Sequence, residues 1–286
     1  MDGDVTLRPV RPADRERIEA ICEEVYEGRD HVPRMLDSWL ADPSASFQAG
    51  ELEGQVVAIQ RLLPVAPGIV LYHALRVAPE ARRQGVGRRM LREGLSDARR
   101  LGFRELRLYT EVLSTTEWVA ADLFEREGFQ LLADCASWKG ARLEGAELPQ
   151  LAQASDVSAL ARLVESDPAL AIYGGVTADW SGPLQPDAEH IARLVGEGLV
   201  RLGPGGRSLA LLRRDSMTKL AVTFLAGASS SLEELLYGLR AEADAQGMSA
   251  CWLLAPGNHP SAASFGTVGY DLGHDEKHAR VYSRAL

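Results

Sequence analysis

One stretch of the chain, residues 76–92, combines arginines and glycines in a way that suits anion binding. It holds six arginines and one glutamate, although the whole chain has a formal net charge of −9. Gly85 and Gly87 lie where an expected strand (residues 69–77) gives way to an expected helix (residues 86–101). Glycines let backbone N–H groups approach an anion closely, and a helix N-terminus adds partial positive charge there. The stretch therefore predicts a site for a polyphosphate ligand.

The pattern of this loop differs from two common phosphate-binding motifs. A Walker loop requires G-x-x-x-x-G-K-[ST], which the chain lacks, and Met90 stands where a dinucleotide fingerprint needs its third glycine. What remains is Arg-x-x-Gly-x-Gly, formed by Arg82, Gly85 and Gly87 after Leu75-Arg76-Val77-Ala78-Pro79. Here the sequence resembles the GNAT acetyltransferase superfamily, whose loop reads [QR]-x-x-G-x-[GA]. An ordinary strand–helix turn with a solvated arginine cluster is the alternative.

The resemblance implies that this loop binds acetyl-CoA. Backbone N–H groups would hold the pyrophosphate, and the preceding strand end would pair with the pantetheine arm. Arginine has forked donors that suit the 3′-phosphate, for which Arg82, Arg83 and Arg88 are candidates. The expected cofactor-binding residues are Leu75, Arg76, Val77, Arg82, Arg83, Gln84, Gly85, Val86, Gly87 and Arg88. The spacing of His274 and His278 suits a metal, but we favour a solvated loop there and expect no metal.

The chemistry that the resemblance implies is direct attack of an amine on a thioester. A primary ammonium with a pKa of about 8–10 is mostly protonated at pH 7, so a nearby base helps. His73, on the strand before the loop, is the candidate catalytic base, with core packing as its alternative role. Tyr72 is the second candidate. The family often uses a tyrosine as general acid, but Phe124 stands at that position, so we assign no acid.

The segment between the first two helices often forms the acceptor-binding floor in this fold. Tyr26, Asp30 and Trp39 are the candidate substrate-binding residues, and Arg34 or Arg61 could pair with a substrate carboxylate. This segment resembles the histidine N-acetyltransferase group through Tyr26, Gly28, Asp30, Pro33, Trp39, Leu40, Asp42 and Pro43. That group has an acidic residue where His73 stands. The expected acceptor is a primary amine of a small molecule, and an amino acid such as histidine is a candidate.

The elements that would position these residues recur along the chain. The sequence predicts the element order β-α-β-β-β-α-β-α-β twice, about 140 residues apart. Corresponding helices end at Gly102 and Gly247, which suit a left-handed cap. The predicted fold class is α/β (α+β), with tandem GNAT-like domains that each have a mixed, mostly antiparallel sheet flanked by helices. Residues 1–142 would be the acetyl-CoA-binding catalytic domain and residues 143–286 a degenerate GNAT-like domain.

The second half lacks the features of a phosphate loop. At the corresponding place it reads Gly227-Ala228-Ser229-Ser230-Ser231-Leu232-Glu233-Glu234, with no arginine and no G-x-G. Two glutamates at the start of a helix oppose a diphosphate. We therefore expect that the second half does not bind CoA, and that it completes the acceptor cleft, packs against the first half or forms a homodimer.

The composition of the chain favours a folded protein and disfavours membrane and nucleic-acid partners. A hydrophobic content of 46% and a charged content of 25% are typical of folded domains. We expect no membrane partner, because no apolar run approaches the roughly 18–20 residues of a membrane span, and no signal peptide. The negative net charge disfavours nucleic acid. Three isolated cysteines (Cys22, Cys135 and Cys251) favour the reducing cytoplasm.

Three functions remain after these exclusions. The preferred function is a small-molecule N-acetyltransferase. The same fold could acetylate a protein N-terminus or lysine, for which an open groove would be expected. A non-catalytic module that senses acetyl-CoA would bind it without releasing a thiol.

Overall fold

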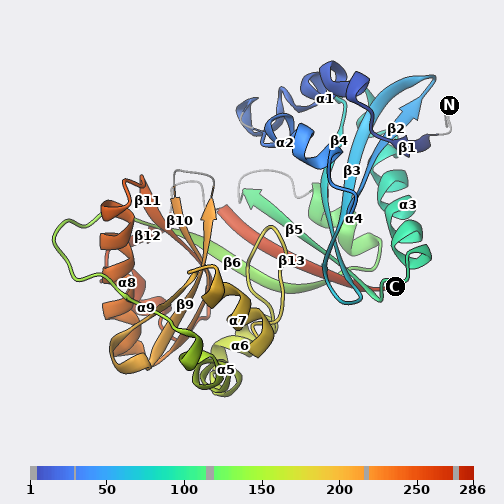
Figure 1. Cartoon of the computed structure of the whole chain (residues 1–286). Coiled ribbons are helices and arrows are strands. Elements are labelled where there is room, and N and C mark those ends of the chain that lie inside the picture. Colours follow the sequence, from blue (N-terminus) through green and yellow to red (C-terminus); the bar gives the residue numbers. More distant parts are fainter. Residues whose placement is uncertain (1–4, 29, 114–118, 216–218, 273–276) are drawn as a thin grey trace. The chain divides into compact units, whose positions relative to one another are not determined.

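The computed structural model describes residues 5–28, 30–113, 119–215, 219–272 and 277–286 (Figure 1). Within these ranges, the side chains of residues 26, 27, 112, 113, 119, 214, 215 and 277 are not described. The chain forms two compact units. Unit 1 comprises Met1–Leu108 and Ser283–Leu286, and unit 2 comprises Tyr109–Tyr282.

Unit 1 is built on a sheet of neighbouring strands. In spatial order these are β1 (Thr6–Pro9), β2 (Ser46–Leu52), β3 (Gln55–Ala66), β4 (Ile69–Val77) and the beginning of β5 (Glu105–Leu113). The pairs are antiparallel except β4 and β5, which run parallel. The last residues of the chain also belong to this unit, because Ser283 Oγ donates to Glu105 (2.6 Å) and Leu286 N donates to the Arg104 carbonyl (3.0 Å).

Three α-helices cover the two faces of this sheet. They are α1 (Arg15–Cys22), α2 (Val32–Leu40) and α3 (Val86–Arg100), and short 3₁₀ turns lie at η1 (Pro12–Asp14), η2 (Val25–Gly28) and η3 (Pro79–Ala81). Neighbouring strand residues point to opposite faces. Tyr72 accordingly packs under Gly94 of α3, whereas His73 contacts Trp39 of α2. Helix α2 was not predicted as a separate helix, although its Pro33 lies in the first turn, where proline is tolerated.

Helix α3 is fixed to the sheet by a close approach and a hydrogen-bonded chain. A Cβ added to Gly94 would lie 2.8 Å from a ring carbon of Tyr72. Tyr72 OH donates to Gln60 (2.9 Å), Gln60 donates to Gln48 (2.9 Å), and Gln48 donates to Asp97 (2.6 Å). Tyr72 therefore has a structural role, and these contacts hold the middle and the C-terminal part of α3 against the sheet.

Unit 2 has further strands and its own helices. Its strands lie in the order β13 (Lys277–Ala285), β6 (Gln130–Gly140), β11 (Ala250–Pro256), β10 (Lys219–Gly227), β9 (Ser208–Asp215), β8 (Val200–Leu202) and β7 (Gln150–Leu151), and β12 (Tyr270–Leu272) also pairs with β6. Its helices are α4 (Val119–Arg126), α5 (Val157–Ser166), α6 (Pro168–Ile172), α7 (Ala188–Gly196), α8 (Ser229–Ala245) and α9 (Ala262–Phe265), with 3₁₀ turns η4 (Ala154–Asp156) and η5 (Pro204–Gly206).

The two halves of the chain share an element order and a local turn. In both, a strand leads through a helix to a parallel neighbouring strand: β4, α3 and β5 in the first half, and β10, α8 and β11 in the second. The Asp14 carboxylate accepts from the Arg11 N–H (2.7 Å) just before α1, and Asp156 accepts from the Gln153 N–H (2.8 Å) just before α5. The predicted tandem fold with mixed, mostly antiparallel sheets is confirmed, whereas its boundary at residues 142/143 stays a prediction.

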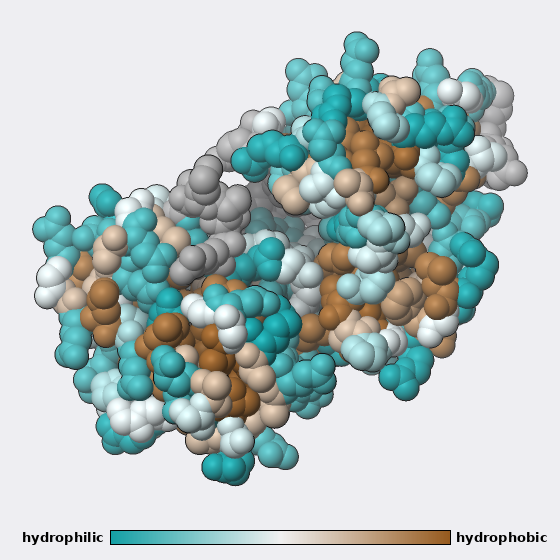
Figure 2. Space-filling model, viewed as in Figure 1, coloured by the Kyte–Doolittle hydropathy of each residue, from teal (hydrophilic) through white to brown (hydrophobic). Residues whose placement is uncertain are grey.

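The glycines predicted to end corresponding helices do so. Gly102 has φ +84° after α3, and Gly247 has φ +67° after α8. On the visible face, hydrophilic residues alternate with hydrophobic patches (Figure 2). No helix in the described part of the chain is both long enough and apolar enough to cross a membrane.

Candidate functional site

A β-bulge interrupts β4 just before the arginine-rich loop. Opposite β3, His73 pairs with Arg61 and Arg76 pairs with Ile59, so β4 has one residue more than β3 in this interval. Ala74 lies in the bulge with φ +57°, a conformation that a side chain disfavours. The ladder between β4 and β5 covers residues 69–72 of β4. Residues 73–77 of β4 lie beyond this ladder. Within the described part of unit 1, their backbone is therefore not paired with β5.

The loop after β4 ends in a glycine cap that faces open space. Gly85 is the N-cap of α3 with φ +81°, and no side chain caps the helix there. A Cβ added to Gly85 would meet no described atom within 4 Å. The first N–H groups of an α-helix, here including Val86 and Gly87, have no carbonyl partner within the helix. The loop therefore presents backbone donors and the positive end of the α3 dipole to that space.

All ten predicted cofactor-binding residues lie in this one strand–loop–helix unit. Leu75, Arg76 and Val77 end β4, Arg82, Arg83 and Gln84 form the loop, and Gly85, Val86, Gly87 and Arg88 begin α3. Some of the side chains support the loop itself. Arg82 Nε donates to the Val77 carbonyl (3.1 Å), and Gln84 Nε2 donates to the Glu80 carbonyl (2.7 Å). In this arrangement Arg82 and Gln84 hold the loop in shape.

Asp30 and Arg76 form an ion pair in unit 1. Arg76 donates to both carboxylate oxygens, from Nε (2.6 Å) and from Nη2 (3.1 Å), and the Val32 N–H donates a third hydrogen bond (3.2 Å). The Asp30 side chain is only 1% exposed. Burial alone would raise the pKa of this carboxyl, but the hydrogen bonds and charge of Arg76 outweigh it and hold the pKa below its ordinary value. The Asp30 carboxylate, which was predicted to bind substrate, is thus bound to Arg76.

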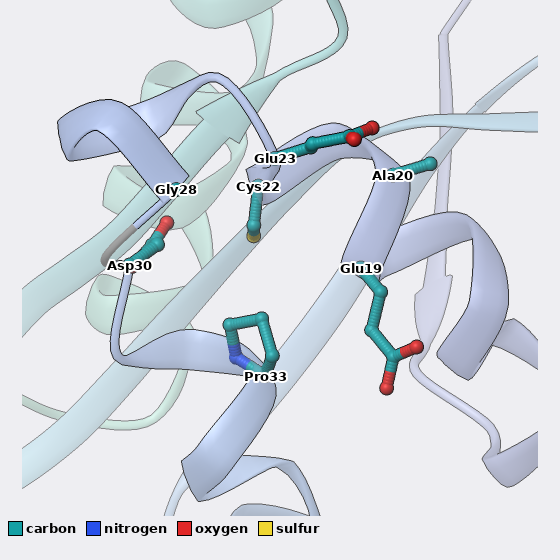
Figure 3. A pocket seen from close by; sticks show the side chains of 7 residues that line it. All are labelled: Glu19, Ala20, Cys22, Glu23, Gly28, Asp30 and Pro33. Carbon is teal, nitrogen blue, oxygen red and sulfur yellow. The ribbon is translucent and has the colours of Figure 1, made fainter.

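A pocket of about 400 Å³ lies beside Asp30, between α1 and the beginning of α2 (Figure 3). It is lined by Glu19, Ala20, Cys22, Glu23, Gly28, Asp30 and Pro33. Burial and the nearby Asp30 raise the pKa of the Cys22 thiol to about 12, so it is not ionised at neutral pH. Three of its lining residues, Gly28, Asp30 and Pro33, belong to the segment predicted to form the acceptor floor, whereas the other four lie on α1 or directly after it. The backbone of Tyr26 lies in η2, and its side chain is outside the described part.

Trp39, Arg61 and His73 form a second cluster, on the α2 side of the sheet. The Arg61 side chain is 4% exposed, and its Nη2 donates to Asp42 (2.5 Å). Its Nη1 lies 3.2 Å from His73 Nε2, and its guanidinium carbon lies 4.9 Å from the centre of the Trp39 ring. The Trp39 and His73 rings meet edge to face at 5.2 Å. The predicted residues Trp39 and His73 are thus in contact, joined by Arg61.

The surroundings of His73 weaken it as a base. Burial lowers the pKa of His73 to about 3, and the positive charges of Arg61, His31 and Arg76 act in the same direction. Moving a proton from an ammonium with a pKa of about 10 to this imidazole would cost about 10 kcal/mol. The base role of His73 stays a prediction, and this environment does not favour it. Tyr72 is buried, and burial raises its pKa well above the ordinary value.

Phe124, which replaces the family tyrosine, packs in an aromatic cluster of unit 2. Its ring lies 5.9 Å from Phe129 and 5.9 Å from Tyr282, measured between ring centres. A phenylalanine has no proton to donate, so this position supplies no general acid.

In the second half, the chain's own groups bind the backbone where the first half has an open loop. The Asp167 carboxylate accepts from the Gly227 N–H (2.7 Å) just before α8. The Leu225 carbonyl lies 3.4 Å from His259 Nε2, and the Leu254 carbonyl accepts from Tyr173 OH (2.8 Å). An internal carboxylate thus binds the last N–H of β10, at the place that corresponds to the end of β4 in the first half. The sequence shows the missing arginines, but it gives no signal that Asp167, 60 residues away, would fold there.

No group of three or more potential metal-binding side chains lies together among the residues that the structure describes. His278 Nδ1 instead lies 2.7 Å from Asp134. His274, the other member of the histidine pair, is outside the described residues.

Comparisons with known proteins agree with this architecture. Residues 14–129 match the sequence model of the acetyltransferase (GNAT) family. Histidine N-acetyltransferase of Oreochromis niloticus is 32% identical over 80 residues, which are 28% of this chain and 24% of that protein. N-acetyltransferase family 8 member 3 of Rattus norvegicus is 33% identical over 121 residues, 40% of this chain and 49% of that protein. The matched part of the chain thus spans about a quarter to a half of these relatives.

A solved structure extends the likeness to the whole chain. A tandem GNAT protein from the clavulanic acid biosynthesis pathway superposes with a TM-score of 0.59 at 13% identity, covering 99% of this chain and 98% of the other. At that identity the likeness concerns the fold. The sequence match to the acetyltransferase (GNAT) family thus covers residues 14–129, and the whole chain has the fold of a tandem GNAT protein.

Proposed function

We propose that the protein transfers an acetyl group from acetyl-CoA to a primary amine of a small molecule. The observation that carries this proposal is the β4–loop–α3 unit, in which the Gly85 cap faces open space and follows the part of β4 that lies beyond the β4–β5 ladder. Phosphate oxygens suit such a cap, since backbone N–H groups and the α3 dipole favour negative charge there.

The residues present fit acetyl-CoA. Backbone N–H groups of the first turn of α3, around Val86 and Gly87, would hold the diphosphate. Arg83 and Arg88 flank that turn and would add positive charge. The edge of β4 at residues 75–77 would pair with the pantetheine amides. When bound, acetyl-CoA supplies an acetyl group activated as a thioester.

The amine reacts in its neutral form. His73 is not a base near the pKa of an amine, because its own pKa is lowered to about 3. We therefore propose that solvent takes the ammonium proton, and that unit 1 contributes by positioning the acceptor beside the β4 bulge. The rate would then rise with pH as the acceptor itself loses its proton.

The acceptor class that we propose is a small amine, with amino acids as the leading candidates. One relative is named a histidine N-acetyltransferase. The cluster of Trp39, Arg61 and His73 provides an aromatic wall and polar groups at the β4 bulge. Because Asp30 is held by Arg76, we assign it the role of fixing the segment before α2, not of binding the amine directly.

Release of free thiol from acetyl-CoA tests this proposal. The panel holds primary amines, amino acids, a lysine-containing peptide and a peptide with a free N-terminus. We expect release with at least one small amine, together with its N-acetyl product by mass spectrometry. Release with the peptides alone would indicate a protein acetyltransferase. Acetyl-CoA binding with no release over the whole panel would indicate a sensing module and overturn the proposal.

We also propose that the protein works in a reducing compartment such as the cytoplasm. All three cysteines are unpaired and buried. The thiols of Cys135 and Cys251 have pKa values raised by burial, so none of them is poised for disulfide chemistry.

A further inference from the structure

We propose that His73 is a neutral hydrogen-bond donor, held in place by Arg61, and that it binds the carboxylate of an acceptor that carries both an amine and a carboxylate. This inference rests on the proposed acetyl transfer and names the acceptor class. Arg61 is here a positioning residue, since it acts through His73.

The contact between Arg61 and His73 fixes which imidazole nitrogen carries the proton. A guanidinium group can only donate hydrogen bonds. His73 Nε2, which lies 3.2 Å from Arg61 Nη1, must therefore accept. A neutral imidazole has one acceptor and one donor nitrogen, so Nδ1 carries the proton. The low pKa of His73 keeps the ring neutral over the physiological range.

The Nδ1–H group is free to bind a ligand. His73 is partly exposed, and no hydrogen bond joins its Nδ1 to any residue that the structure describes. The cation at Nε2 polarises the ring, which makes Nδ1–H a stronger donor. Its best partner is an anionic oxygen, because a charged acceptor strengthens a hydrogen bond about twofold. A carboxylate of the acceptor molecule is such an oxygen.

The position of Arg61 leaves one of its own donor nitrogens without a hydrogen bond. Its Nε is buried and has no partner among the described residues. Burial lowers the pKa of Arg61, although Asp42 acts in the opposite direction. Trp39 packs on both Arg61 and His73 and so limits their rotamers. A buried donor without a partner is uncommon, which favours a functional role for the pair over a purely stabilising one.

The charged groups around His73 agree with an anionic partner. Arg61 lies on β3, Arg76 on β4, and His31 precedes α2; the charge of each disfavours a positive charge on the His73 ring. Two carboxylates lie behind these arginines: Asp42 is bound to Arg61, and Asp30 is bound to Arg76. The acidic side chains are thus engaged with arginines, and a bare ammonium has no described carboxylate facing it at His73.

Acceptor pairs that differ only at the carboxylate test the proposal. Each amino acid acetylated in the panel is compared with its primary amide, by kcat/KM at saturating acetyl-CoA. We expect the acid to exceed the amide at least tenfold in the wild-type protein. In His73→Leu this preference should fall below threefold. In His73→Asn, whose side-chain amide can donate from nearly the same place as Nδ1, it should largely persist. The KM for acetyl-CoA should stay within twofold in both variants.

Equal kcat/KM for acid and amide in the wild type, or a tenfold preference that survives in His73→Leu, would overturn this inference and leave acetyl transfer intact. Absence of any acetylated amine would instead overturn the proposed function. A binding readout is independent of activity: in protein with ¹⁵N-labelled histidine, adding the amino acid should shift the His73 Nδ1 resonance, and adding the amide should not. The same shift with both compounds, or with neither, would contradict a carboxylate contact.

Discussion

Arg76 holds Asp30 across 46 residues of sequence by donating to both oxygens of its buried carboxylate. The pair ties the segment before α2 to the end of β4, where the predicted pantetheine-binding edge begins. This ion pair thus helps to fix the acceptor segment relative to the cofactor edge, both within unit 1.

Replacing Arg76 with methionine should destabilise the protein strongly. The change leaves the Asp30 carboxylate buried without its cation, and breaking a buried pair in this way costs about 3–5 kcal/mol. The free energy of unfolding, measured by urea titration, should therefore fall by that amount. The double variant Asp30→Asn with Arg76→Met removes the stranded charge and should recover part of the loss. A single-variant loss below about 1 kcal/mol would show that the pair has little structural weight.

The same pair should make stability depend on pH in the acidic range. The folded-state pKa of Asp30 is held below its ordinary value, so the unfolded chain binds the proton first as pH falls. The stabilisation is fully present above the ordinary carboxyl pKa of about 4 and is lost below it. Thermal unfolding of wild type and of Asp30→Asn at pH 7 and pH 3.5 should show the larger decrease for the wild type. Equal decreases would contradict the lowered pKa.

His73 should stay neutral through the physiological range. Its folded pKa is about 3, against about 6.5 for an ordinary histidine, so the unfolded chain takes up this proton first. His73 therefore contributes stability that is present above pH 6.5 and is lost as the pH falls towards 3. Histidine ¹³C resonances followed from pH 8 to pH 5 should show no titration of His73. Titration near pH 6.5 would restore His73 as a candidate base.

One chain should bind one molecule of acetyl-CoA. In the second half, Asp167 already occupies the Gly227 N–H, and His259 and Tyr173 contact neighbouring carbonyl groups. Isothermal titration calorimetry should give a stoichiometry near one per chain. Asp167→Ala should leave this value unchanged and lower stability by about 1 kcal/mol, because Asp167 also caps α6 through the Ala169 N–H. A stoichiometry of two would show that the second loop can bind the ligand.

The contact between α3 and β4 should not tolerate a methyl group. In Gly94→Ala the new Cβ would lie 2.8 Å from the buried Tyr72 ring, and overpacking of this kind costs about 1–3 kcal/mol. Gly196→Ala is the matched control, since this helical glycine has no neighbouring atom within 4 Å of its added Cβ among the described residues. Chemical denaturation should show a loss for Gly94→Ala alone. Similar stabilities of the two variants would contradict the close approach.

The parts of the site that are local in sequence could be predicted from it. A strand, a glycine-containing basic loop and a helix are consecutive, so the ten cofactor residues fall in one unit without any knowledge of the fold. The repeated element order also follows from periodicity and glycine stops, as Gly102 and Gly247 show.

The parts that depend on register and on long-range pairing could not be predicted. The bulge at Ala74 decides that His73 pairs with Arg61, yet an alanine with φ +57° has no signal in sequence. The buried partners of Asp30 and His73 lie 46 and 12 residues away, on other elements. From residue type alone, Asp30 was predicted to bind substrate and His73 to act as a base. Their arginine partners, Arg76 and Arg61, change what each group can do.

Calorimetric titration of acetyl-CoA into Gly85→Val and Gly102→Val tests the central claim most directly. Both glycines have similar positive φ, +81° and +84°, both have open space around an added Cβ among the described atoms, and they flank opposite ends of α3. The two variants therefore carry the same kind of backbone strain. We expect Gly85→Val to weaken acetyl-CoA binding at least tenfold, about 1.4 kcal/mol, and Gly102→Val to bind like the wild type. Unchanged affinity in Gly85→Val, or equal losses in both variants, would contradict a diphosphate site at the beginning of α3.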